Sequence, residues 1–191
     1  MSAASQRKLL WTVLAINGGL FVGELVFGLI ASSMGLVADS LDMLADALVY
    51  GLSLFAVGTT VARKARIVRL SGILQLTLAV AGIAEVVRRS IDPSDAPDPS
   101  VMVIVSLIAL TGNLISLFLL RRERHGEAHL QASWIFTSND VLANIGVMSA
   151  ALFVFLLDSP WPDLVVGIIV FGLVVRGALR IFKLNRSGDT T

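Results

Sequence analysis

Three aspartates stand inside one long apolar stretch in the first third of the chain. Asp39, Asp42 and Asp46 interrupt a hydrophobic run from Met34 to Val61, which is long enough to cross a lipid bilayer. An α-helix turns about 100° per residue, so their spacing places all three carboxyl groups on one stripe of a helix. A charged side chain in the middle of a membrane helix costs about 2.5–3.5 kcal/mol, so three on one face need a compensating partner. Because almost every Arg and Lys lies outside the apolar segments, we expect that partner to be a cation.

The composition excludes an ordinary soluble domain. The chain of 191 residues is 55% hydrophobic and 15% charged, whereas charged residues make up about a quarter of a typical soluble domain. We therefore expect a polytopic protein of the lipid bilayer, with no nucleic-acid partner. Because the chain has no Cys, disulfides and thiolate metal ligands are excluded, and a bound metal would need oxygen ligands or the two His residues.

Apolar segments alternate with short polar connectors along the whole chain. The first segment follows basic residues, as in a signal peptide, but it has no convincing cleavage site, so we expect it to be retained as a membrane span. The predicted fold class is an all-α membrane protein with six transmembrane helices in a single transmembrane domain. The predicted spans cover residues 9–30, 34–61, 67–87, 101–120, 130–157 and 164–184.

The basic residues predict the orientation of these spans. All Lys and Arg residues except Arg88 and Arg89 fall on the side of the two termini. Because short loops rich in Lys and Arg stay on the cytoplasmic side, we expect a multi-pass protein of the inner membrane with both termini cytoplasmic. The opposite, outward loops then hold acidic residues, namely Asp92, Asp95, Asp98, Asp158 and Asp163.

The fifth segment carries a second group of polar residues. Asp140 and Asn144 are four residues apart and therefore lie about 40° apart on a helix. Asn139 points about 100° away, which fits a second-shell or packing role better. If the face of Asp140 and Asn144 meets the aspartates of the second segment, three carboxyl groups and an amide converge near the middle of the membrane. Such a cluster predicts a metal site.

Other polar residues have less definite roles. Asn17 and Glu24 are seven residues apart and share a face of the first segment. Glu24 can serve as a proton site or as a neutral hydrogen-bonding strut, and we place Asp39 with these two residues as a second shell or proton path. His125 and His129, in the fourth connector, either contact metal at the entrance or are simply exposed to solvent.

Three stretches of the sequence carry a resemblance to a known family. They are ELVFGLIASSMGLVADSLDMLADAL at 24–48, LIALTGNLISLFLLRR at 107–122, and NDVLANIGVMSAAL at 139–152 followed by SPWPDLVVGIIV at 159–170. These stretches resemble the cation diffusion facilitator family of divalent-metal/proton antiporters. The family's transport site is a tetrahedral cluster with two ligands four residues apart on the second helix and two on the fifth. The resemblance implies that Asp42, Asp46 and Asp140 are three of these ligands.

The fourth ligand position departs from the family pattern. It is usually His in zinc-selective members, whereas here it is Phe136, which cannot bind metal. We expect Asn144 to supply the missing oxygen, with Asn139 or water as the alternatives. The resemblance also implies a homodimer, although the family's soluble C-terminal domain is not expected in a chain that stops at Thr191.

The predicted function is export of a divalent metal cation from the cytoplasm in exchange for protons, by alternating access and without a prosthetic group. Carboxylates bind metal only when deprotonated, which couples metal loading to proton release. An oxygen-rich site relaxes the preference for zinc toward manganese, iron, cobalt or cadmium, and the metal stays open.

Two other functions compete with metal export. A proton-coupled small multidrug exporter would use Glu24 to bind organic cations, and a non-transporting scaffold would bind metal only structurally. An enzyme is not expected, because no nucleophile and base are placed together in the sequence.

Overall fold

Long helices make up the described part of the chain. The structure is a computed structural model, and it describes residues 3–55, 61–92, 96–121 and 128–187. Over these residues it contains helices and no strand, which confirms the predicted all-helical fold class. The six helices are α1 (Ala3–Ile30), α2 (Met34–Phe55), α3 (Val61–Ile91), α4 (Pro99–Leu120), α5 (Ala128–Leu157) and α6 (Trp161–Ser187).

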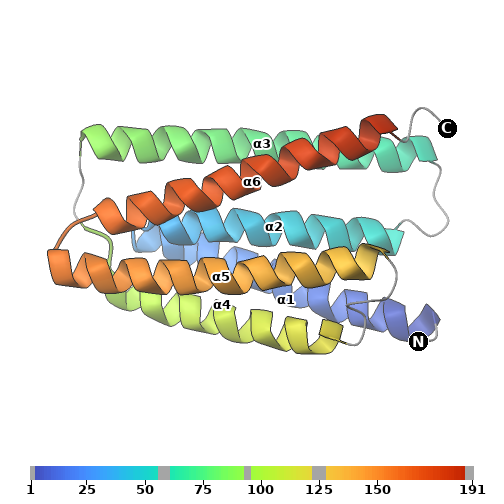
Figure 1. Cartoon of the computed structure of the whole chain (residues 1–191), viewed down its shortest axis with the longest axis horizontal. Coiled ribbons are helices and arrows are strands. Elements are labelled where there is room, and N and C mark those ends of the chain that lie inside the picture. Colours follow the sequence, from blue (N-terminus) through green and yellow to red (C-terminus); the bar gives the residue numbers. More distant parts are fainter. Residues whose placement is uncertain (1–2, 56–60, 93–95, 122–127, 188–191) are drawn as a thin grey trace.

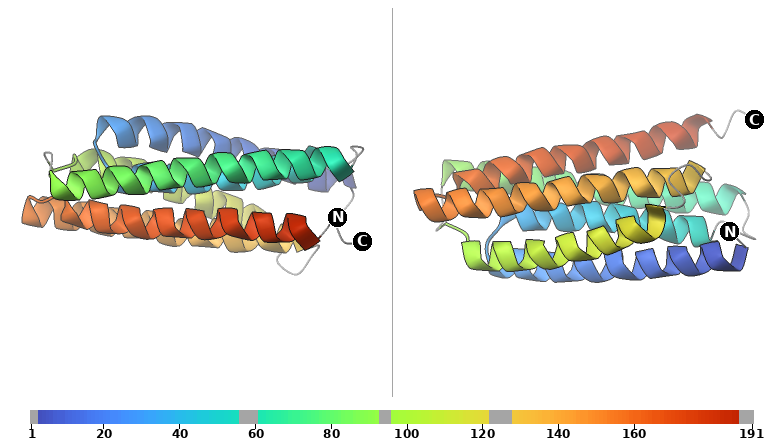
Figure 2. Two further views of the ribbon diagram at one scale, coloured as in Figure 1. Left: turned by 90° about the horizontal axis from the view of Figure 1, so that it is seen from above. Right: turned by 60° about the horizontal axis from the view of Figure 1, so that its bottom comes forward.

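The helices lie side by side along one long axis (Figure 1). The N- and C-termini lie at one end of this bundle, which we call the terminal end. The opposite end, where residues 31–33 join α1 to α2, we call the corner end. Helix α1 packs along α2, α4 packs against α1 and α5, and α3 pairs with α6 (Figure 2). Helix α2 contacts α1, α3, α5 and α6 and so lies at the centre of the bundle.

The lengths and surfaces of the helices fit a membrane domain. Within the described residues, four helices contain apolar stretches long enough to cross a membrane, at Arg7–Ile30, Pro99–Leu120, Thr137–Leu157 and Trp161–Leu179. Helices α2 and α3, with 22 and 31 residues, also have the length of about 20 residues that a bilayer requires. Large apolar side chains cover the outside of the bundle, and Ile108 and Phe155 are 60% and 71% exposed. Lipid tails are the natural surroundings of such a surface.

Apolar clusters pack the helices together at both ends of the bundle. At the terminal end, Tyr50 and Leu54 of α2 pack with residues of α1 and α4. Toward the corner end, Leu36 of α2 packs with residues of α4 and α5. Between α3 and α6, the ring of Phe171 lies directly on Gly82, where an added Cβ atom would overlap the ring. Close packing therefore fixes α2, which carries the three aspartates, among its neighbours.

Candidate metal centre

The aspartates of α2 face the interior of the bundle. Asp39 and Asp46 are buried, with 0% and 3% of their surface exposed, and Asp42 is half-buried. Their helical spacing produces this arrangement, because positions three, four and seven residues apart share one side of a helix. Buried carboxyl groups need partners that water would otherwise supply. The neighbouring helices provide them.

Asp46 meets Asp140 between α2 and α5. The two carboxyl groups lie within hydrogen-bonding reach of each other, and Asp140 is 1% exposed. The amide nitrogen of Asn144 donates a 2.8 Å hydrogen bond to the backbone oxygen of Asp140, one helical turn away. The Oδ1 atom of Asn144 and the Oδ2 atom of Asp140 are buried without a hydrogen-bond partner. The structure thus brings together Asp46 and Asp140, and it buries Asn144 one helical turn from Asp140 on the same helix.

A second acidic pair lies between α1 and α2. The carboxyl group of Glu24, which is 1% exposed, lies close to that of Asp39. Both groups, together with Asp42, lie within electrostatic range of Asp140. The amide nitrogen of Asn17 donates to the backbone oxygen of Val13 at 3.0 Å, and its Oδ1 atom is buried without a hydrogen-bond partner. Acidic groups therefore extend from α1 through α2 to α5.

Tyr50 and Thr137 complete the surroundings of Asp46. The Tyr50 hydroxyl donates to Oδ2 of Asp46 at 3.3 Å and lies 3.0 Å from Oγ1 of Thr137. Both Tyr50 and Thr137 are 0% exposed. Sequence reasoning missed this pair, although Tyr50 follows Asp46 by four residues and therefore shares its helix face.

The acids do not form a ready-made ligand set. Within the ranges that the structure describes, no three His, Asp or Glu side chains are gathered closely enough to hold a metal ion. The acids instead form two pairs, with Asp42 between them on α2. Asn139 is exposed on the outside of α5, so we do not include it in the site. His125 lies outside the described residues, as do the side chains of His129 and Phe136.

A further acid, Asp163, binds the start of α2 at the corner end. Asp163 belongs to the first turn of α6 and is 1% exposed, whereas we expected it in an outward loop. Its carboxylate accepts hydrogen bonds from the Ser33 hydroxyl at 2.6 Å, the Met34 amide at 2.6 Å and the Gly35 amide at 3.0 Å. The first amides of a helix have no partner within the helix and carry a partial positive charge, so a carboxylate is well suited to cap them.

Other elements also hold the corner between α1 and α2. Arg89 of α3 donates to the backbone oxygen of Ser32 at 2.6 Å and to Glu85 at 2.8 Å. The backbone amide of Asp98, which precedes α4, donates to the backbone oxygen of Ala31 at 3.2 Å. Ser32 adopts a left-handed conformation, with φ of 57°. Residues from α3, α6 and the start of α4 therefore bind one short corner.

Buried acids at the centre of a helical membrane bundle define a class of protein that handles cations within the bilayer. The chain matches the family model of the cation efflux transmembrane domain over residues 10–66 and 68–187. It therefore belongs to the cation diffusion facilitator family, whose members carry divalent cations across membranes and are transporters rather than enzymes. A comparison with curated proteins finds no match.

Proposed function

We propose that this cation efflux transporter exchanges a divalent transition-metal cation for protons at a site between α2 and α5. The ligands are the carboxyl groups of Asp42, Asp46 and Asp140 and the Oδ1 atom of Asn144. One observation carries the proposal: two buried carboxyl groups from different helices, Asp46 and Asp140, approach each other in the core of the bundle.

The oxygen atoms around this pair support a cation as the ligand. Oδ2 of Asp140 and Oδ1 of Asn144 are buried without a hydrogen-bond partner, and a cation would satisfy both. Asp42, half-buried on the same helix face, turns toward the pair when the cation binds. These ligands are oxygens, so the site accepts manganese, iron or cobalt as well as zinc or cadmium.

Proton exchange follows from the closeness of the two acids. Two buried carboxyl groups that face each other repel when both are charged, so either a proton or a cation is needed between them. A divalent cation needs both groups deprotonated, so its binding releases protons. Alternate exposure of the pair to the two sides of the membrane couples metal movement to proton return.

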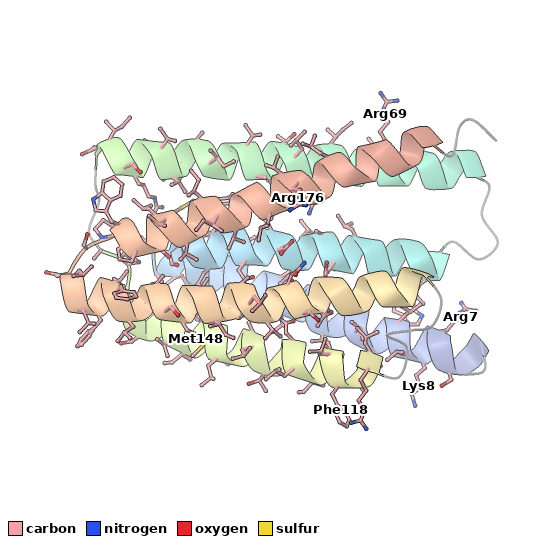
Figure 3. All side chains as sticks on the ribbon, viewed as in Figure 1. Arg7, Lys8, Arg69, Phe118, Met148 and Arg176 are labelled. Carbon is pink, nitrogen blue, oxygen red and sulfur yellow. The ribbon has the colours of Figure 1, made fainter. Side chains whose placement is uncertain are left out.

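The charges at the ends of the bundle support a direction of transport. Arg7, Lys8 and Arg69 lie toward the terminal end (Figure 3). By the positive-inside rule this end faces the cytoplasm. The cation then enters from the terminal end and leaves at the corner end.

The test is metal flux into proteoliposomes with and without a pH gradient. Wild-type protein should carry cobalt, manganese, zinc or cadmium only when a pH gradient is present. Asp46→Asn and Asp140→Asn should reduce that flux at least about a hundredfold, because each removes a charged ligand. Asp92→Asn, which changes an exposed acid at the corner end, is the matched control and should transport normally. Undiminished flux in either site variant would contradict the proposal.

A cavity between α1 and α4 favours the organic-cation alternative. It has a volume of about 300 Å³ and an almost wholly apolar lining that includes Phe27 and Ile108, with Glu24 as its acidic group. This second function predicts that the wild-type protein transports a lipophilic cationic dye and that Glu24→Gln abolishes the transport. Dye flux that is absent from the wild-type protein would exclude it.

A further inference from the structure

The acidic pair of Asp46 and Asp140 is covered on the side of the terminal end. Helix α2 runs from the corner end to the terminal end, and α5 runs in the opposite direction (Figure 1). Tyr50 on α2 and Thr137 on α5 therefore both lie nearer the terminal end than the acids, by about one helical turn. A cation that approaches from that end meets these two residues first.

A hydrogen-bonded contact joins the two helices at this level. The Tyr50 hydroxyl lies 3.0 Å from Oγ1 of Thr137, and it donates to Oδ2 of Asp46 at 3.3 Å. Both side chains are fully buried, so water does not compete for these contacts. The contact links α2 to α5 and also fixes the orientation of the Asp46 carboxyl group.

Apolar side chains of α1, α2 and α4 pack together at the same level. The buried Tyr50 packs in one cluster with Leu10 and Val13 of α1, Leu54 of α2 and Leu120 of α4. Each of these residues is at most 5% exposed. This layer excludes a hydrated cation on the side of α1 and α4, so the contact between Tyr50 and Thr137 is the barrier on the side of α5.

We propose that Tyr50 and Thr137 form the gate on the terminal side of the site. Breaking their hydrogen bond opens the seam between α2 and α5 and turns Asp46 toward the entering cation. The gate rests on the proposed function in one respect, namely that the acids behind it bind the cargo. Its opening does not itself require any cargo, so it can be measured without metal.

The chain has no cysteine, so a single introduced cysteine reports access without background labelling. Ala143→Cys places the reporter on α5 between Asp140 and Asn144, beyond the gate as seen from the terminal end, where Ala143 is 8% exposed. The probe is a small, charged, membrane-impermeant methanethiosulfonate. It is added without metal to reconstituted vesicles of known orientation, first from the terminal side and then from the corner side.

Adding Tyr50→Phe or Thr137→Val to this reporter should raise labelling from the terminal side about fivefold, and labelling from the corner side should not change. Thr137→Ser keeps the hydroxyl and should label like the parent. Thr111→Val is the matched control, because the exposed Thr111 hydroxyl donates to the backbone oxygen of Leu107 on its own helix.

Only a rise confined to the terminal side supports the gate. Unchanged labelling in both gate variants, or an equal rise from both sides, would overturn it, since a general loss of packing opens both sides. Because metal is absent, a failed gate and a failed metal-transport proposal give different results.

Discussion

The two ends of α2 are held in different ways. At the corner end, its first amides bind a buried carboxylate of α6, and a guanidinium group of α3 binds the adjoining corner. At the terminal end, Tyr50 contacts Thr137 of α5 through two neutral hydroxyl groups, and the rest of its contacts in the cluster are apolar. Hydrogen bonds to charged groups contribute about 1.5–3 kcal/mol each, roughly twice the contribution of neutral ones.

This difference indicates which end of α2 moves. Among the described residues, charged groups bind the corner end at several points, whereas the contact between α2 and α5 at the terminal end joins two neutral hydroxyl groups, so we expect the terminal end to open at lower cost. The acidic pair lies between the two ends, so a small tilt of α2 about the corner would separate Asp46 from the gate. The predictions below test this contrast, and the largest expected effect comes first.

Asp163→Ala should cause the largest loss of stability. The change leaves the Ser33 hydroxyl and the Met34 and Gly35 amides without their acceptor in a buried place. We expect a loss of about 3 kcal/mol, measured as a lower midpoint of thermal unfolding in detergent. Asp92→Ala, an exposed acid at the same end, should unfold like the wild type. If the two variants unfold alike, the corner is not the fixed end.

Gly35→Ala should have the second largest effect. A Cβ atom at position 35 would lie 2.8 Å from Oδ1 of Asp163, so the carboxylate would have to move away from the start of α2. Overpacking of this kind costs about 1–3 kcal/mol, which the same unfolding assay detects. Gly19→Ala is the matched control, because its Cβ atom would meet nothing within 4 Å. That control should be neutral or slightly stabilising, since Ala favours a helix over Gly.

Arg89→Gln should have a smaller effect. The Arg89 guanidinium group binds the backbone oxygen of Ser32 and the Glu85 carboxylate near the end of the bundle. Its side chain keeps 19% of its surface exposed, so solvent weakens the ion pair and we expect a loss of about 1 kcal/mol. Arg69→Gln, an exposed change on the same helix, serves as control. A loss as large as that of Asp163→Ala would mean that α3, rather than α6, anchors the corner.

Thr137→Val should have the smallest effect on stability. The substitution keeps the shape of the side chain and removes one neutral hydrogen-bond partner of Tyr50. We expect a loss of about 0.5–1 kcal/mol in the unfolding assay. A loss greater than that of Asp163→Ala would reverse the contrast between the two ends.

The sequence predicted the helices because their signals are local. Apolar stretches of membrane length end at charged or turn-forming residues. At the start of α4, for example, the side chain of Asp98 accepts hydrogen bonds from the backbone amides of Ser100 and Val101. Helix α3 continues past both ends of its predicted span, because its arginine-bearing turns remain helical beyond the apolar segment. The shared face of Asp42 and Asp46 likewise follows from helical spacing alone.

The sequence did not predict contacts that depend on how the helices pack. The burial of Asp163 requires the first turn of α6 to meet the corner between α1 and α2, and nothing near Asp163 in the sequence signals that contact. Tyr50 shares the helix face of Asp46, but its contact with Thr137 depends on the relative rotation of α2 and α5. Residues that position the acids were therefore harder to find than the acids themselves.

Calorimetric titration of the purified protein with a divalent metal tests the central claim most directly, when it is repeated in buffers with different ionisation enthalpies. This measurement gives both the affinity and the number of protons released for each metal bound. The wild-type protein should release protons when it binds a metal, and its affinity should fall as the pH falls. Asp46→Asn and Asp140→Asn should bind the metal at least about tenfold more weakly and release fewer protons. Binding that is equally tight in both variants, or that releases no proton, would contradict a metal site built from Asp46 and Asp140.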